Sequence, residues 1–224
     1  MNGLRKAYGL IVFISIAISL NSQSNERIFF DHYSGESGLS HIGVNSIMQD
    51  SRGFLWIGTY DGLNRFNGYK FRVFRHIPGD STSLVHNRVH TIIETHDSLL
   101  WIGTEEGICV YDPTYEKFFI PEFSDIQLTR SRVVKLFEDS HQRIWILSNN
   151  NIYIIEKDRK SFRNLSYQNS SGITISFSDI TETQEGYFFV TSNYGLITIN
   201  PEFEIIKNSL NNNQNYRCIE LQGD

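Results

Sequence analysis

The sequence is poor in cysteine, has no block of acidic or basic residues, and has no long apolar run after its first 20 residues. A net charge of −5 spread along 224 residues gives no reason to expect nucleic acid as a partner. No histidines or cysteines have the spacing of a zinc site, and no Ser-His-Asp order or glycine-rich phosphate loop is present. We therefore expect no metal, no other cofactor and no catalytic centre of these types.

The N-terminal segment differs from the rest of the chain. Arg5 and Lys6 precede an uncharged apolar run from Ala7 to Leu20, and polar residues 21–24 follow. This is the layout of a secretory signal peptide, and the run is short for a membrane-spanning helix. We predict that residues 1–22 are a signal peptide or, alternatively, an N-terminal anchor. In either case the remainder lies outside the cytoplasm, and it stays attached to the membrane if the segment is not cleaved.

One aromatic phrase recurs at a nearly constant distance along the chain. It reads Leu-Trp-Ile-Gly-Thr around Trp56 and Trp101, Ile-Trp-Ile-Leu-Ser around Trp145, and Phe-Phe-Val-Thr-Ser around Phe189. The aromatic positions are separated by 45, 44 and 44 residues. Units of this length that are rich in β-formers are typical of propeller blades. The glycines that recur with the aromatics are Gly58, Gly62, Gly103 and Gly107.

Each unit contains four short apolar segments joined by turn residues, which predicts four-stranded sheets. The first segment of each unit has apolar residues on both sides, such as Val44 and Ile47, so it needs cover on both faces. Stacked blades provide that cover, and we expect the large aromatic rings to fill the space between neighbouring blades. The predicted fold class is all-β, a β-propeller of about four four-stranded blades. The blades are expected at residues 39–74, 84–119, 128–163 and 172–207.

Both ends of the repeat region, residues 27–224, carry partial repeats. Residues 27–34 occupy the slot of a stray outer strand, and residues 216–224 resemble the start of a fifth blade. Seven blades would need about 300 residues, so we expect an incomplete, open ring that is cut short before its remaining blades. Cys109 and Cys218 fall in blades too far apart for a disulfide, so both are expected to be small buried side chains.

Residues 45–68, which read NSIMQDSRGFLWIGTYDGLNRFNG, resemble the two-component regulator propeller repeat. This repeat occurs in the periplasmic sensor regions of hybrid histidine kinases of Bacteroidetes. The similarity is strong over residues 27–112, moderate over 128–163 and weak over 172–206, and Leu147 stands where the family usually has glycine. The resemblance implies two seven-bladed propellers, a further β-domain, a membrane helix, and a kinase core, receiver and DNA-binding module. It also implies glycan fragments as ligands and transcription of polysaccharide-utilisation genes as the output.

We therefore interpret the chain as an extracytoplasmic ligand-sensing module of a two-component phosphorelay, truncated before its membrane span and kinase. The phospho-accepting histidine, the ATP site and the receiver aspartate are absent from this sequence, so no enzymatic activity is expected of it. The expected partners are an oligosaccharide, the remaining blades of the same protein, and a second copy in a homodimer of the full-length sensor. The alternative is a truncated secreted propeller enzyme, a hydrolase or lyase that acts on glycans.

The candidate ligand residues are Tyr60, Asp61, Asn64 and Arg65. They combine an aromatic ring with planar polar groups, which suits stacking against a sugar and bidentate hydrogen bonding to its hydroxyls. The alternative interpretation is structural: Tyr60 covers a blade edge, and Arg65 pairs with a neighbouring acid. Ligands of propellers usually bind loops at one mouth of the ring, contributed by several blades.

Other clusters of titratable residues have simpler explanations. His86, His90 and His96 spread over a loop, a strand and a turn, so we expect solvated or capping histidines rather than a metal site. Glu105 and Glu106 lie in a predicted turn between two strands, where we expect both carboxylates to be solvated.

Overall fold

The computed structural model describes residues 30–122, 130–149, 151–166, 175–193 and 195–210. The chain divides into two compact units, Met1–His32 and Tyr33–Asp224. Of the first unit only residues 30–32 are described, and they form no strand. The second unit contains a short 3-10 helix, η1 (Gly35–Ser37), and all the strands given below. The predicted signal segment 1–22, the predicted start of a fifth blade at 216–224, and Cys218 lie outside the described residues.

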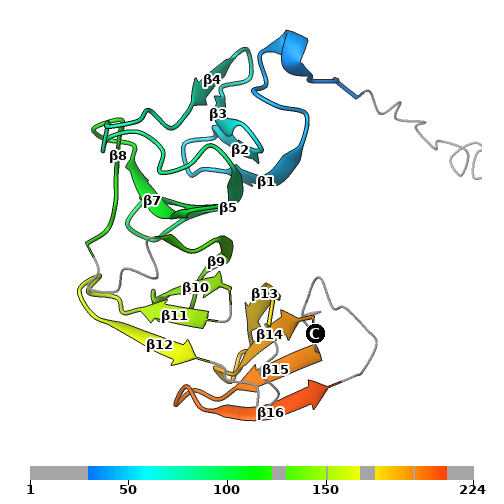
Figure 1. Cartoon of the computed structure of the whole chain (residues 1–224), viewed down its shortest axis with the longest axis vertical. Coiled ribbons are helices and arrows are strands. Elements are labelled where there is room, and N and C mark those ends of the chain that lie inside the picture. Colours follow the sequence, from blue (N-terminus) through cyan, green and yellow to red (C-terminus); the bar gives the residue numbers. More distant parts are fainter. Residues whose placement is uncertain (1–29, 123–129, 150, 167–174, 194, 211–224) are drawn as a thin grey trace, which may run out of the picture. The chain divides into compact units, whose positions relative to one another are not determined.

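The described residues form sixteen strands in four antiparallel sheets of four strands each, which follow one another along the chain (Figure 1). The first sheet contains β1 (Val44–Gln49), β2 (Leu55–Thr59), β3 (Gly62–Phe66) and β4 (Phe71–Phe74). The second contains β5 (Val89–Glu94), β6 (Leu100–Thr104), β7 (Gly107–Asp112) and β8 (Lys117–Phe119). The third contains β9 (Val133–Glu138), β10 (Ile144–Ser148), β11 (Asn151–Ile155) and β12 (Phe162–Ser166). The fourth contains β13 (Phe177–Glu182), β14 (Phe188–Ser192), β15 (Gly195–Ile199) and β16 (Ile205–Leu210). The predicted all-β class with four-stranded blades is confirmed.

Antiparallel order places the connections of each sheet alternately at its two ends. The turns between second and third strands therefore lie at the same end as the segments that lead from one sheet to the next. We call this end the connector face; it includes residues 60–61, 75–88 and 105–106. The opposite end, which we call the hairpin face, contains the other turns of each sheet, including residues 50–54 and 139–143.

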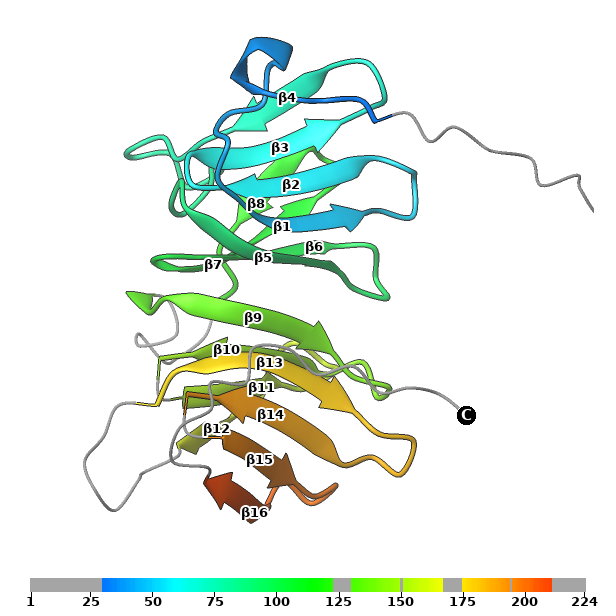
Figure 2. The same ribbon diagram turned by 90° about the vertical axis from the view of Figure 1, so that its right-hand side faces the viewer.

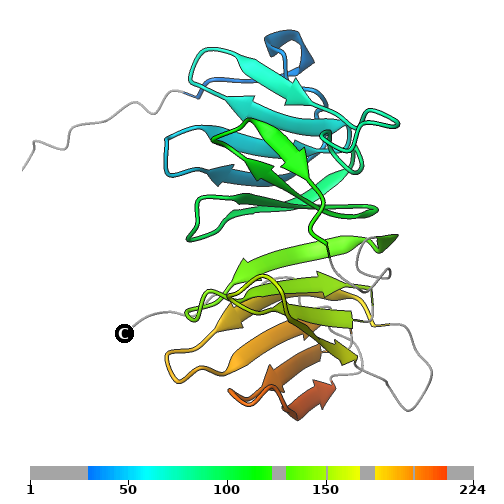
Figure 3. The same cartoon turned by 90° about the vertical axis from the view of Figure 1, so that its left-hand side faces the viewer.

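Three apolar cores join the four sheets, and each core contains the tryptophan of the earlier sheet. Figures 2 and 3 show the succession of sheets from two sides, and each first strand lies near the next one: β1 near β5, β5 near β9, and β9 near β13. The tryptophans share these cores with residues of the following sheet: Trp56 with Val89 and Leu100, Trp101 with Val133 and Ile144, and Trp145 with Phe177 and Phe188. The prediction that aromatic rings fill the space between neighbouring blades is confirmed, and burying each ring stabilises the fold by about a few kcal/mol.

The glycines of the tryptophan strands mark close approach between sheets. A Cβ atom on Gly58 would lie 2.6 Å from Cγ1 of Val89, and one on Gly103 would lie 2.6 Å from Cγ1 of Val133. Because the interior is close-packed, a larger residue at either position would push the neighbouring sheet away. In the third sheet the same position is Leu147, which is fully buried in the core shared with the fourth sheet. The departure of Leu147 from the repeat pattern therefore changes the local packing and leaves the sheet order intact.

The segment before the first sheet differs from the prediction of an outer strand at residues 27–34. Residues 30–34 form no strand, and residues 27–29 lie outside the described residues. Ser34 instead caps η1, because its Oγ accepts a hydrogen bond from the backbone N–H of Glu36 at 3.3 Å. At the other blades, β12 and β16 run to Ser166 and Leu210, beyond the expected limits of 163 and 207.

Cys109 is a free and fully buried side chain in β7, as the sequence predicted. Burial raises the pKa of its thiol to about 12, so the reactive thiolate is not populated at neutral pH. Among the described residues, no helix has the length and apolar character needed to cross a membrane.

Candidate functional site

On the hairpin face, a buried carboxylate organises the turn before the tryptophan strand. Asp50 Oδ1 accepts hydrogen bonds from two backbone N–H groups of its own turn at 3.0 and 2.9 Å. Its Oδ2 accepts a third from Trp56 Nε1 at 2.8 Å. Asp139 makes the same contacts in the third sheet, with Trp145 Nε1 at 2.9 Å. These carboxylates are fully engaged in shaping the turn, so we assign them a structural role.

A second repeated contact joins each hairpin turn to the following sheet. The backbone N–H and the Oγ of Ser51 donate to the carboxylate of Glu94 at 2.6 and 2.7 Å. Glu94 ends the first strand of the second sheet, and the next two sheets repeat the arrangement. The equivalent pairs are His96 with Glu138 and Ser140 with Glu182. The polar groups of the hairpin face thus lock successive sheets together.

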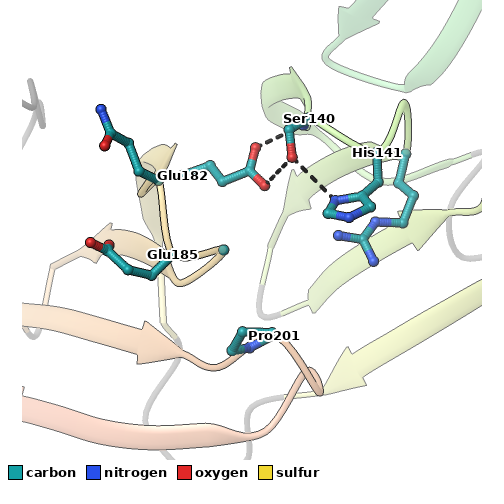
Figure 4. A pocket seen from close by; sticks show the side chains of 8 residues that line it. Ser140, His141, Glu182, Glu185 and Pro201 are labelled. Atoms are coloured by element: carbon teal, nitrogen blue, oxygen red, sulfur yellow. Dashed lines mark hydrogen bonds between the residues drawn. The ribbon is translucent and has the colours of Figure 1, made fainter.

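The hairpin face also holds a cavity of about 260 Å³ between the third and fourth sheets. Figure 4 shows Ser140 at its wall, between Glu182 and His141. Ser140 Oγ donates to Glu182 at 2.7 Å and lies 3.1 Å from Nδ1 of His141. In a catalytic triad the histidine lies between the hydroxyl and the carboxylate. Here the hydroxyl lies in the middle and its proton is held by the carboxylate, so this group belongs to the lock between sheets.

On the connector face, three basic side chains gather around one carboxylate. Glu105 Oε2 lies 2.8 Å from Nε2 of His90, within hydrogen-bond distance. The same oxygen lies 3.7 Å from NH1 of Arg88 and 4.0 Å from Nε of Arg132. Arg88 directly precedes β5 and Arg132 directly precedes β9, so the two arginines occupy the same position in successive repeats. The repeat itself therefore places both guanidinium groups on the connector face, near the start of β5 and of β9; we call this edge the rim.

The charges of this cluster are unevenly distributed. Burial lowers the pKa of His90 below its ordinary value, and the charges of Arg132 and Arg88 add to this against the opposing effect of Glu105. Burial works against ionisation of Glu105, but the hydrogen bond from His90 and the two arginines outweigh it, so the pKa of Glu105 is lowered. At neutral pH the carboxylate is therefore ionised, and a neutral His90 donates from Nε2 to it. The two arginines leave the cluster with a net positive charge.

Tyr60 extends the cluster towards the first sheet. The guanidinium carbon of Arg88 lies 4.4 Å from the centroid of the Tyr60 ring, and the ring of His41 lies 5.5 Å from it. Tyr60 is 46% exposed. It precedes β3 as Glu105 precedes β7, so the cluster is built from equivalent turns of two sheets. A cation over the face of a tyrosine is a favourable contact, which holds the Arg88 side chain at the rim.

Of the other predicted ligand residues, Asp61 lies beside Tyr60 in the same turn. Its carboxylate pairs with Arg75 at 3.0 Å and accepts a hydrogen bond from Nδ2 of Asn87 at 3.4 Å. Backbone contacts fix the turn, since the N–H of Gly62 donates to the carbonyl of Asn87 at 2.7 Å. Tyr60 and Asp61 thus lie together on the connector face.

Asn64 and Arg65 lie apart from that pair. Asn64 is fully buried, and its Oδ1 accepts a hydrogen bond from the backbone N–H of Ser40 at 2.9 Å. Arg65 pairs with Glu116 at 3.0 Å and lies over the ring of Phe54, 4.9 Å from its centroid, towards the hairpin face. Both side chains are used in contacts within the protein, and a ligand role for the four residues stays a prediction.

Sequence reasoning missed the cluster around Glu105. Glu106 is exposed, as expected, whereas the carboxylate of Glu105 is 33% exposed and also pairs with His90, whose side chain is 8% exposed. His86 behaves as a capping residue, since its Nδ1 accepts the backbone N–H of Arg88 at 3.0 Å. Within the described ranges, no three histidine, cysteine or acidic side chains lie close enough together to hold a metal ion. The signal in the sequence was the arginine that recurs 44 residues apart, before the first strand of two successive repeats.

Comparison with known proteins identifies the repeat. Residues 38–61 and 83–106 match the family described as two component regulator propeller. A histidine kinase of Formosa agariphila is 44% identical over 77 residues, which are 34% of this chain and 6% of the relative. A solved extracellular domain assigned to a hybrid two-component system of B. thetaiotaomicron has a TM-score of 0.57 at 28% identity, covering 74% of this chain and 24% of that one. The chain thus spans a small part of the relatives it matches.

A likeness to enzymes is limited to the fold. Virginiamycin B lyase from Staphylococcus aureus has a TM-score of 0.56 at 17% identity, covering 73% of this chain and 54% of the lyase. At this level of identity the likeness shows a shared propeller fold and carries no argument about catalysis. The family match, by contrast, covers the start of the first and of the second sheet. The two matched segments are therefore similar to the two-component regulator propeller repeat.

Proposed function

We propose that this chain is part of the extracytoplasmic ligand-sensing region of a hybrid two-component histidine kinase, and that its connector face contacts an oligosaccharide. The family repeats and the similarity to a histidine kinase and to an extracellular sensor domain support the sensory role. The chain spans only a fraction of these relatives, so the membrane span, the kinase and the remaining blades belong, in this proposal, to the longer protein. The same proposal places residues after the signal segment in the periplasm.

The observation that carries the choice of face is the half-exposed cluster of Tyr60, Arg88 and Arg132. On the hairpin face, the repeated carboxylates already accept hydrogen bonds from serine hydroxyls or tryptophan indoles of the protein. On the connector face, a tyrosine and two guanidinium groups stay accessible at adjacent repeats. An aromatic side chain with a few placed polar groups is the usual composition of a small-ligand site.

In this proposal the module binds its ligand without transforming it. A ligand shifts the sensor between two arrangements only by the difference of its affinities for them. A homodimer of the full-length protein would supply two such arrangements, with the connector face of each copy holding one ligand.

The test is oligosaccharide binding by the full chain, measured by calorimetry over a panel of glycan fragments, with Tyr60→Ala and Tyr187→Ala as matched variants. We expect saturable binding that Tyr60→Ala weakens about tenfold, because truncation removes a rigid amphipathic ring from the site. Tyr187 is 37% exposed in the turn between β13 and β14 on the hairpin face, so its loss should leave affinity unchanged. If both substitutions weaken oligosaccharide binding equally, the connector face is not the binding site.

A further inference from the structure

Two arginine side chains on the connector face have unused hydrogen-bonding capacity. The side chains of Arg88 and Arg132 are 43% and 46% exposed. Within the described part of the chain, neither guanidinium has an acceptor at hydrogen-bond distance, and Nε of Arg88 is buried without a partner. Both groups instead share the charge of one distant carboxylate, Glu105 Oε2, at 3.7 and 4.0 Å.

Three other arginines of the first three sheets pair directly with a carboxylate. Arg72 binds Glu116 at 2.7 Å, Arg75 binds Asp61 at 3.0 Å, and Arg143 binds Asp139 at 2.6 Å. Each of these guanidinium groups donates a direct hydrogen bond to its carboxylate. Arg88 and Arg132 differ, because Glu105 already receives its short hydrogen bond from His90. Glu105 therefore faces two arginines and has no hydrogen bond with either of them.

The surroundings favour an anionic group over a neutral one. A guanidinium presents a planar fork of donors that matches a carboxylate or sulfate with two parallel hydrogen bonds. The Tyr60 ring lies 4.4 Å from the Arg88 guanidinium carbon and limits the orientations of this fork. His90 is held neutral by burial, so it neither repels nor replaces the arginines at neutral pH. The site thus offers two partly preoriented cations to an incoming anion.

We propose that Arg88 and Arg132 bind the acidic group of an oligosaccharide, a uronate carboxylate or a sulfate ester, with Tyr60 positioning Arg88. This inference rests on the proposed function and adds the charge of the ligand. One guanidinium comes from the connector before the second sheet and the other from the connector before the third sheet. The ligand therefore bridges two blades at the point where their first strands begin.

The experiment uses the full chain and compares trigalacturonate with its fully methyl-esterified form, in which every carboxylate charge is removed and the sugar backbone is kept. A sulfated carrageenan tetrasaccharide and inorganic sulfate form the second pair of probes. Affinities are measured by calorimetry, and the Nε–H resonances of Arg88 and Arg132 are followed by NMR. We expect at least one acidic oligosaccharide to bind about tenfold or more tightly than the neutral ester and to shift both resonances.

Three variants make the result specific. Arg88→Gln and Arg132→Gln should each weaken binding of the acidic probe about tenfold and leave the weak binding of the neutral ester unchanged. Arg72→Gln is the matched control, because it removes the same charge from a side chain that is 49% exposed and already paired with Glu116. Raised salt should weaken only the acidic probe, since the contact is between half-exposed charges.

The outcomes separate this inference from the proposed function. If acid and ester bind equally and only Tyr60→Ala matters, the charge assignment is overturned while oligosaccharide sensing stands. If inorganic sulfate binds as tightly as the acidic oligosaccharides, the rim holds any anion and the oligosaccharide assignment is overturned. If no acidic probe shifts either arginine resonance, the arginine pair has no ligand role, and the Tyr60 experiment alone decides whether the connector face binds neutral glycans.

Discussion

The first and second sheets share the tryptophan strand Leu-Trp-Ile-Gly-Thr, yet their first strands have different surroundings. Val44 and Ile47 of β1 are 40% and 65% exposed, whereas Val89 and Ile92 of β5 are 0% and 5% exposed. Both strands have apolar residues on both faces, so both require packing partners on both sides. In the second sheet the preceding sheet supplies that cover, and Trp56 lies in the shared core. The comparison teaches that burial in a repeat protein is set by the neighbouring repeat as much as by the strand itself.

The largest expected effect is the loss of the Ile92 side chain. Ile92→Ala should lower the free energy of unfolding by about 2–4 kcal/mol, because it opens a cavity in the core between the first two sheets. Ile47→Ala is the matched change in the first sheet, where an exposed side chain should contribute less than about 0.5 kcal/mol. The measurement is urea unfolding of the full chain, followed by tryptophan fluorescence. Similar effects at the two positions would show that β1 is covered in solution.

A second prediction uses the turn before the tryptophan strand. In the first sheet Trp56 Nε1 donates to Asp50, but the second sheet has Thr95 at that place, and Trp101 Nε1 is buried without a partner among the described residues. Asp50→Thr copies the second sheet into the first and should cost about 1–3 kcal/mol, because it leaves a buried indole N–H unpaired.

The reverse exchange sharpens the same comparison. Thr95→Asp in an Asp97→Asn background should stabilise the chain by up to about 1 kcal/mol, since Trp101 gains an acceptor. Asp97→Asn removes a carboxylate that lies close to residue 95 and would repel the carboxylate introduced by Thr95→Asp. Thermal unfolding of both variants and of Asp97→Asn alone provides the measurement. If Asp50→Thr proves neutral, the indole hydrogen bond does not account for the aspartate in the first and third turns.

The sequence was sufficient to predict the sheets because the repeat pattern is local. Tryptophan, glycine and apolar positions recur within each unit, and three neighbouring copies confirm one another. The cluster around Glu105 could not be found in this way, because its members come from one turn, one strand and two connectors of different repeats. The side-chain contacts of Asn64 and Arg65 could not be predicted from the repeat pattern either. Adjacent residues of a strand point to opposite faces, and only the partners Ser40 and Glu116 determine what each side chain does.

The exposure of β1 agrees with the expectation of an open ring, but it does not follow from the residues of this strand. The alternation of Val44 and Ile47 is the same as in the buried strands, so the residues alone predict burial. Exposure follows from which sheet packs on the other side, which is a property of tertiary arrangement. Repeats therefore predict the interior of the array better than its ends.

The smallest expected effect concerns pH and the different rims of the two sheets. The second residue of the first strand is Asn45 in the first sheet and His90 in the second. Burial lowers the pKa of His90 below its ordinary value of about 6.5, so the unfolded chain takes up this proton more readily than the folded one. Stability should therefore fall as the pH drops below about 6.5, until the folded histidine is also protonated. The lowered pKa of Glu105 adds a separate loss at lower pH, as the solution becomes acidic enough to protonate carboxylates.

Replacing His90 by the residue of the first sheet should remove the first of these losses. His90→Asn is expected to flatten the melting temperature between neutral pH and about pH 5, the window set by the ordinary histidine pKa. Glu105→Gln is the control, because it removes the partner that opposes the shift while His90 stays buried, so the loss should persist or grow. If the melting temperature of His90→Asn falls with decreasing pH as steeply as that of the unmodified chain, this histidine is already solvated in the folded protein. The connector face of the second sheet would then be as open to water as that of the first, and burial would no longer disfavour a charge on His90 beside Arg88 and Arg132.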